Sequence, residues 1–175
     1  MKNHRPVGPR NAHRPLLAAD GTDWLSDASW KTYVRAAAVH GNSAWFAWNA
    51  AAGGGFPEPH VQIVKINTNT FTLESQMQIW NSGFAFAYPY FEMNAEGQLG
   101  MTVAFGGGTF DSSSVVGVWG DFAIYSPRLS SASRLNYGHY HTTRRSGSDS
   151  MKWVGAGYIR EADGTIVPYY VRYSR

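Results

Sequence analysis

The sequence predicts an all-β protein made of short antiparallel strands joined by tight turns. Aromatic residues make up 15% of the 175 residues, 19 residues are glycine, and only 15% are charged. Aromatic residues favour strands and glycine favours turns. Short segments in which apolar and polar residues alternate also recur along the chain, with turn residues between them. Together these features favour strands and turns over helix bundles.

A first group of strands is expected between about residues 31 and 81. The predicted strands are Tyr33–His40, Ala44–Asn49, His60–Ile66 and Phe71–Trp80. The clearest is HVQIVKI, where apolar and polar residues alternate as in a half-buried strand. A Gly-rich loop at 50–59 is expected to join the second strand to the third.

Two further groups are expected at about 84–126 and 134–175. Their predicted strands are Phe84–Met93, Gln98–Phe105, Val115–Trp119 and Phe122–Tyr125, then Tyr137–Arg145, Lys152–Arg160 and Thr165–Tyr173. The Gly-rich segment Gly106–Ser113 is interpreted as a second long loop. The Ser-rich segment Ser126–Ser133 is interpreted as a linker between the groups.

The second strands of the three groups resemble one another. They read AWFAW at 44–48, MTVAFG at 101–106 and KWVGAGY at 152–158. A degenerate four-stranded unit that repeats about every 50 residues is typical of β-propeller blades. A sandwich or barrel also uses many short strands and is the alternative. We expect about three blades over residues 20–175, preceded by a flexible basic tail at 1–19.

Charge and composition exclude several classes of function. Lys2, Arg5, Arg10 and Arg14 lie in the first fifteen residues, which leaves 11 basic and 12 acidic groups for the rest of the chain. A basic nucleic-acid-binding face on the domain is therefore not expected. The absence of cysteine excludes disulfides, cysteine-ligated metals and cysteine nucleophiles.

The chain shows no membrane or export signal. No apolar run approaches the 18 or so residues of a membrane helix, and the first residues lack the apolar stretch of a signal peptide. The compartment is left open, and would be extracellular or periplasmic if the chain is part of a longer exported protein.

Several runs resemble the C-terminal blades of bacterial sialidase-like (BNR-type) propeller proteins. They are VHGNSAWFAW at 39–48, FAYPYFEMN at 86–94, GQLGMTVAFGG at 97–107, YGHYHTTR at 137–144, VGAGY at 154–158 and the segment 169–175. The segment Asp20–Trp24 is a distorted version of the Asp-box of such proteins. The resemblance consists of blade-packing motifs and implies the propeller fold, with carbohydrate as the partner.

The blade topology predicts which side chains meet. The start of the innermost strand and the loop between the second and third strands should lie at the same face of each blade. The innermost strands would supply Tyr33, Arg35, Tyr88, Tyr90, His139 and His141, and the loops would supply Glu58, His60, Asp111, Glu161 and Asp163. Carboxylates and phenols in one depression, with aromatic faces to stack on sugar rings, are compatible with glycan handling.

A glycoside hydrolase of sialidase-like architecture is the leading hypothesis. Glu58 or Asp111 would be the acid/base, Tyr88 or Glu92 the nucleophile or stabiliser, and Arg35 a clamp for an anion. The remaining candidates, expected to bind substrate, are Tyr33, His60, Tyr90, His139 and His141. Each of these residues also has an ordinary structural explanation in a turn, a core or an ion pair.

Two other functions remain open: a lectin-like module without catalysis, and a structural or truncated propeller without a ligand. His139 and His141 are two positions apart, which would let them share a metal, but no third ligand is evident and no metal or cofactor is expected. Three blades do not close a ring. We therefore expect a homodimer, or a higher homo-oligomer, that completes one.

Overall fold

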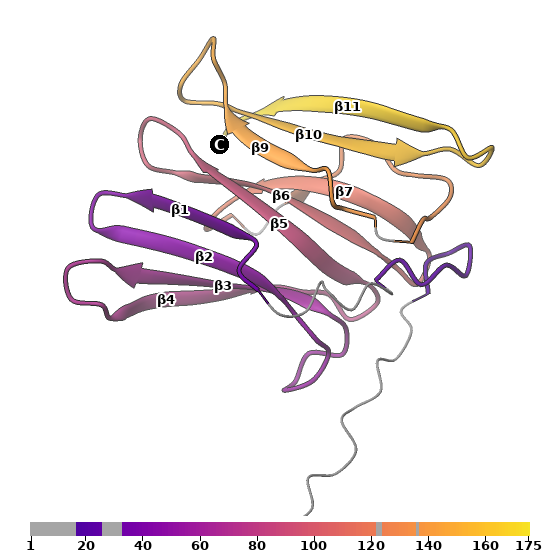
Figure 1. The fold of residues 1–175 in the computed structure, drawn as a ribbon, viewed down its shortest axis with the longest axis horizontal. Coiled ribbons are helices and arrows are strands. Elements are labelled where there is room, and N and C mark those ends of the chain that lie inside the picture. Colours follow the sequence, from indigo (N-terminus) through magenta and orange to yellow (C-terminus); the bar gives the residue numbers. More distant parts are fainter. Residues whose placement is uncertain (1–16, 26–32, 122–123, 136) are drawn as a thin grey trace, which may run out of the picture.

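The computed structural model of the chain describes residues 17–25, 33–121, 124–135 and 137–175. Within these ranges the chain forms eleven strands in three antiparallel sheets and no helix, so no helix there could span a membrane. The second sheet lies between the first and the third (Figure 1). The predicted all-β class is confirmed, and the sheets are arranged as propeller blades.

Each sheet is built from strands that are consecutive in the sequence. The first has the order β1 (Ala36–His40), β2 (Ser43–Ala50), β3 (His60–Asn67), β4 (Leu73–Ile79). The second has the order β5 (Ala85–Met93), β6 (Leu99–Gly107), β7 (Phe110–Val118), β8 (Ile124–Tyr125). The third contains β9 (Thr142–Arg145), β10 (Trp153–Arg160) and β11 (Ile166–Tyr173).

The innermost strands of the three sheets are neighbours. β5 contacts β1 on one side and β9 on the other. Strands β2 and β3 also contact β5, while β10 contacts β6 and β7, so the sheets pack face to face in the order of the chain. A sandwich would have two sheets and a barrel one closed sheet, and neither matches this arrangement.

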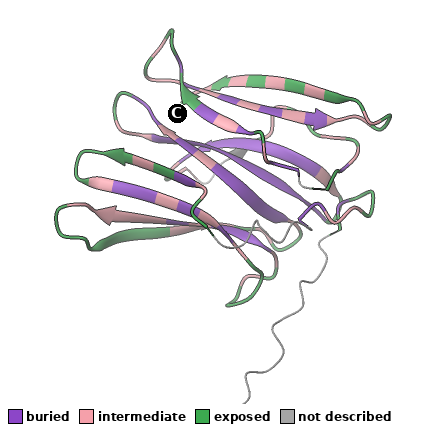
Figure 2. Cartoon of the chain, in the orientation of Figure 1, coloured by how far each residue is buried: buried purple, intermediate pink, exposed green. Residues whose placement is uncertain are grey.

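The second sheet holds most of the core because both of its faces are covered. Every residue of β6 is buried, whereas β4 and β11 have exposed positions (Figure 2). Between the first two sheets, Trp45 and Ile63 pack with Phe86, Met101 and Val103. Period-two alternation in β2 and β3 places these apolar side chains on one face.

Glycines allow the third sheet to approach the second closely. The ring of Trp153 is fully buried and its Nε1 donates to the Glu92 carbonyl at 2.8 Å. A Cβ atom on Gly100 would lie 2.6 Å from this ring, and one on Gly155 would lie 2.8 Å from Val116. Small residues at these positions are therefore a requirement of the packing.

The prediction of a loop at Gly106–Ser113 is wrong. β6 continues to Gly107 and β7 begins at Phe110, so the two strands form a tight hairpin in which Gly107 and Gly108 have φ of 110° and 61°. A long loop after the second strand therefore occurs only in the first sheet, at 51–59. The serines of β7 were misleading, since they pack inside a buried strand.

The predicted tail overlaps an ordered hairpin. Leu17 pairs with Asp23 across a turn in which Gly21 has φ of 83°, and Trp24 is completely buried. Ala18 and Trp24 pack with the start of β5. Residues 17–19, which were expected to belong to the tail, are part of this hairpin, and residues 1–16 lie outside the described part. The Asp-box-like segment Asp20–Trp24 forms the turn and the buried tryptophan of this hairpin.

Candidate functional site

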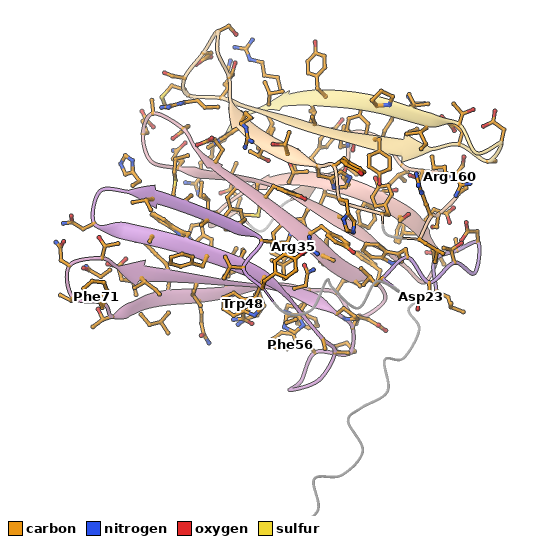
Figure 3. The ribbon with its side chains drawn as sticks, in the orientation of Figure 1. Asp23, Arg35, Trp48, Phe56, Phe71 and Arg160 are labelled. Atoms are coloured by element: carbon orange, nitrogen blue, oxygen red, sulfur yellow. The ribbon has the colours of Figure 1, made fainter. Side chains whose placement is uncertain are left out.

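Side chains from all three sheets meet near the starts of the innermost strands. Arg35 precedes β1, and its Cζ lies 4.3 Å from the ring centre of Tyr88 in β5 and 4.7 Å from that of Tyr33. The Tyr88 ring lies 5.1 Å from the ring of His139, which precedes β9. We call Tyr33, Arg35, Tyr88, Tyr90 and His139 the inner-strand cluster. Figure 3 shows Arg35 where the first sheet meets β5.

The Arg35 guanidinium has hydrogen-bond donors that no described residue engages. Its backbone N–H donates to the Ala47 carbonyl at 2.8 Å, which fixes the start of β1. Its Nε and Nη2 are buried, and neither has a hydrogen-bond partner among the described residues. Because buried charged donors without acceptors are costly, this guanidinium is suited to bind an acceptor that the described residues do not supply.

Tyr88 occupies a strained position in β5. It has φ of 56°, which is unusual for a bulky residue, and it lies where the pairing with β6 shifts between Ala87 and Tyr90. Its N–H donates to Oδ1 of Asn49 at 2.8 Å. Gly138 packs so closely that an added Cβ would lie 2.5 Å from Cδ2 of Tyr88. Such strain persists only where the surroundings enforce it, and it is concentrated at functional sites.

Tyr90 ties β5 to the segment before β9. Its hydroxyl donates to the carbonyl oxygen of His139 at 3.2 Å. Burial raises the pKa of Tyr90, an effect that the nearby positive charge of Arg35 partly opposes. The phenol is therefore neutral at physiological pH and keeps the hydrogen that it donates to the His139 carbonyl.

His141 lies in an aromatic enclosure beside the cluster. Its ring centre is 5.1 Å from that of Tyr137 and 5.5 Å from that of Tyr158. Burial, reinforced by His139, lowers the pKa of His141 to about 3. The Tyr137 hydroxyl donates to the Tyr158 carbonyl at 2.5 Å, which closes the enclosure.

The expected strand at Tyr137–Arg145 begins later, since 137–140 form turns and β9 starts at Thr142. The prediction that His139 and His141 lie on the innermost strand of the third sheet is therefore wrong. Across the described ranges, no group of three or more His, Asp or Glu side chains could hold a metal.

Asp111 is engaged in a structural network. Its Oδ1 accepts a hydrogen bond from the Ser133 hydroxyl at 2.9 Å and from the Asp20 backbone N–H at 3.3 Å. Asp20 in turn accepts from the Ser133 N–H at 2.6 Å. This network joins the first residues of β7 to the 17–25 hairpin and to the linker before the third sheet, so Asp111 has a definite structural role.

The two candidate glutamates, Glu58 and Glu92, lie near opposite ends of β5. Glu92 lies near the end of β5, opposite Gly100, and its Oε1 accepts from the N–H of Met93 at 3.0 Å. Glu58 is the residue before Pro59, which ends the 51–59 loop, and the Pro59 carbonyl accepts from the Phe86 N–H at 3.0 Å. Among the described contacts no hydrogen bond or ion pair engages the Glu58 carboxylate, which leaves it available.

His60 is directed away from the inner-strand cluster. It stacks on Phe56 at 4.1 Å, and Phe56 meets Trp80 edge-on at 5.6 Å. Because adjacent residues of a strand point to opposite faces, His60 faces away from Val61, which packs in the core shared with β5. Burial lowers the pKa of His60.

Sequence reasoning missed the residues that position the cluster. They are Asn49, Tyr137, Gly138 and Tyr158. Gly138 lies in the quoted run YGHYH, so its place between two aromatic residues was a usable signal. Nothing local marks Asn49 as the partner of a residue 39 positions away.

Comparisons with known proteins find a similar fold among solved structures. No protein-family model matches the chain, and no curated protein matches it. The fold is similar to "Crystal structure of a thermostable family-43 glycoside hydrolase", with 11% sequence identity and a TM-score of 0.43. The match covers 76% of this chain and 51% of the other, so the chain spans about half the length of that protein.

Proposed function

We propose that the inner-strand cluster binds the acidic group of a carbohydrate. The observation that supports this most strongly is Arg35, whose Nε and Nη2 are buried without a hydrogen-bond partner in the described residues. A carboxylate accepts two parallel hydrogen bonds from a guanidinium in this way. The contacts of Arg35 with the rings of Tyr33 and Tyr88 hold the guanidinium in place.

Neighbouring aromatic groups suit a sugar ring. Tyr33 is about half exposed and can stack on the apolar face of a pyranose. The Tyr90 hydroxyl donates its hydrogen to the His139 carbonyl, and its oxygen can accept a hydrogen bond from a sugar hydroxyl. The ligand class is therefore an acidic sugar such as a uronic or sialic acid, within an oligosaccharide or glycoconjugate.

Calorimetric titration with glucuronic acid, N-acetylneuraminic acid and glucose tests the proposal. We expect the acids to bind and glucose to bind at least about tenfold more weakly, because it lacks the carboxylate. Arg35→Met should abolish this preference. Arg128→Met is the matched control, since Arg128 forms a surface ion pair with Glu161 at 2.9 Å. Equal binding by wild type and Arg35→Met would reject the role of Arg35.

Hydrolysis of the bound glycan, as in a glycoside hydrolase of sialidase-like architecture, is the second candidate. Two observations favour it: the strained Tyr88 lies against Arg35, and the Glu58 carboxylate is free at the end of a loop tied to β5. Glu58 or Asp111 would be the acid/base, and Tyr88 or Glu92 the nucleophile or stabiliser. Methylumbelliferyl glycosides of acidic sugars provide the assay.

The conservative variants Glu58→Gln, Asp111→Asn, Tyr88→Phe and Glu92→Gln separate these roles. Loss of turnover with sugar binding intact would identify a catalytic group. Asp111→Asn keeps an acceptor for Ser133, so the network around it can survive. Binding without turnover in the wild type would favour a lectin-like module, and neither binding nor turnover would leave only the structural alternative.

We further propose that a second copy of the chain completes the ring. The first and third sheets each pack against the second on one face, and Val39 in β1 and Tyr170 in β11 are 65% and 76% exposed. Among the described residues no other sheet packs on these outer faces, so they are free to pack against a sheet of a second copy. Light scattering should give the mass of a dimer or a higher homo-oligomer, and a stable monomer would contradict this assembly.

A further inference from the structure

A cavity of about 480 Å³ lies between the outer strands of the first two sheets. Its apolar walls come from Met77 and Ile79 of β4, Phe84 and Phe86 at the start of β5, Met101 of β6 and Val118 of β7. We propose that it is a binding site for a neutral aromatic molecule that carries one oxygen acceptor. None of its lining residues belongs to the inner-strand cluster, so this site is separate from the proposed sugar site.

The size and lining of the cavity indicate an apolar occupant. Its volume falls in the range of about 300–1,000 Å³ that small-molecule sites occupy. Water gains little in a cavity whose walls are mainly aliphatic and aromatic. A flat ring placed there would meet Phe84, which already packs edge-on with Phe86 at 5.3 Å. Aromatic rings favour such contacts with other rings.

The charge of the lining excludes an ionic occupant. Asp121 is the charged residue among those that line the cavity, and its Oδ1 accepts a hydrogen bond from Arg175 Nη2 at 2.6 Å. The negative charge of Asp121 is therefore balanced by the positive charge of Arg175. A charged ligand would therefore lose its hydration without gaining a counter-ion.

Side-chain amides supply the polar part of the site. The Oδ1 atom of Asn81 accepts a hydrogen bond from the N–H of Gly83 at 2.9 Å. The two hydrogens of the Asn81 amide therefore remain able to donate to a ligand. Gln78 also lines the cavity. Both amide groups can donate to an oxygen on the ligand, so a phenol or aryl ether fits better than a bare hydrocarbon.

Trp80 provides an accessible aromatic wall. It is 49% exposed while its ring meets Phe56 edge-on. Held by this contact, the indole can cover a ligand that enters between the sheets. Its partial exposure also makes Trp80 a suitable position to mutate, because its truncation should not disrupt the core.

The test uses 2-naphthol as the neutral probe and naphthalene-2-sulfonate as its charged counterpart. Amide NMR spectra are recorded on the full chain during titration. We expect saturable shifts at Gly117, Val118 and the side-chain amides of Gln78 and Asn81, with weaker binding of the sulfonate. Trp80→Ala should weaken 2-naphthol binding about tenfold through loss of one aromatic wall. Tyr170→Ala, at another exposed aromatic residue, is the control.

The proposal would be overturned by the absence of saturable shifts, by shifts confined to other faces of the molecule, or by equal binding of the two probes. If Trp80→Ala and Tyr170→Ala reduce binding equally, the probe is binding to the surface without a specific site. Arg35→Met should leave 2-naphthol binding unchanged. This variant separates a failure of this inference from a failure of the proposed sugar site.

Discussion

Replacing Gly100 with alanine tests the close packing of the second and third sheets. The new Cβ would lie 2.6 Å from three atoms of the Trp153 indole, whereas ordinary contacts begin at 3.4 Å. The ring is fully buried and its Nε1 is held by the Glu92 carbonyl at 2.8 Å. The added methyl group therefore has to displace a large side chain that has little room to move.

The expected loss of stability follows from these contacts. Overpacking of a buried site costs about 1–3 kcal/mol. Distortion of the Trp153–Glu92 hydrogen bond adds about 1 kcal/mol. Replacing glycine with alanine also stabilises the folded state by about 0.5–1 kcal/mol, because it reduces the conformational entropy of the unfolded chain. The net reduction in the free energy of unfolding is about 2 kcal/mol, or about 4–8 °C in Tm for a domain of this size.

Urea unfolding followed by tryptophan fluorescence provides the measurement. Gly147→Ala is the matched control, because a Cβ at Gly147 would meet nothing within 4 Å. It should be neutral or slightly stabilising. If the two alanine variants have the same stability to within about 0.5 kcal/mol, the close contact between Gly100 and Trp153 does not exist and the packing of the sheets has been described wrongly.

Two further predictions concern the surroundings of the inner-strand cluster. The folded chain holds the pKa of His141 at about 3, below its value of about 6.5 in an unfolded chain, so the unfolded chain takes up a proton that the folded chain does not. The free energy of unfolding should therefore fall by about 1.4 kcal/mol per pH unit as the pH drops from 6 to 5. In urea titrations, His141→Phe should make this dependence on pH shallower. An unchanged slope would show that His141 is not buried as described. Asn49→Ala leaves the buried N–H of Tyr88 without its acceptor and should cost about 1–3 kcal/mol in thermal unfolding, whereas Asn69→Ala in an exposed turn should cost almost nothing; equal effects would contradict the role of Asn49.

Local sequence patterns predicted the strands well where one face of a strand is buried. Alternation located β3, and the predicted bounds of β3, β10 and β11 lie within one or two residues of the observed ones. It failed at β7, because a strand buried on both faces need not alternate and its glycines and serines look like a loop. It also extended β9 into the turns at 137–140, since aromatic residues favour strands only where neighbours can pair with them.

The candidate site was only partly predictable for a similar reason. The blade topology places the starts of neighbouring inner strands together, and this is how Arg35, Tyr88 and His139 come into contact. The placement of Asp111 in a hydrogen-bond network with Asp20 and Ser133 depends on residues 91 and 22 positions away. Contacts of this kind are set by the packing of the sheets, and no local pattern encodes them.

One measurement tests the convergence of the three sheets most directly: a nuclear Overhauser spectrum of the chain with labelled aromatic rings. The Tyr88 ring should show cross-peaks both to the side chain of Arg35, from the start of the first sheet, and to the ring of His139, from the start of the third. A Tyr88 ring that shows neither contact, in a protein whose strand pairings are otherwise intact, would mean that the three inner strands do not meet.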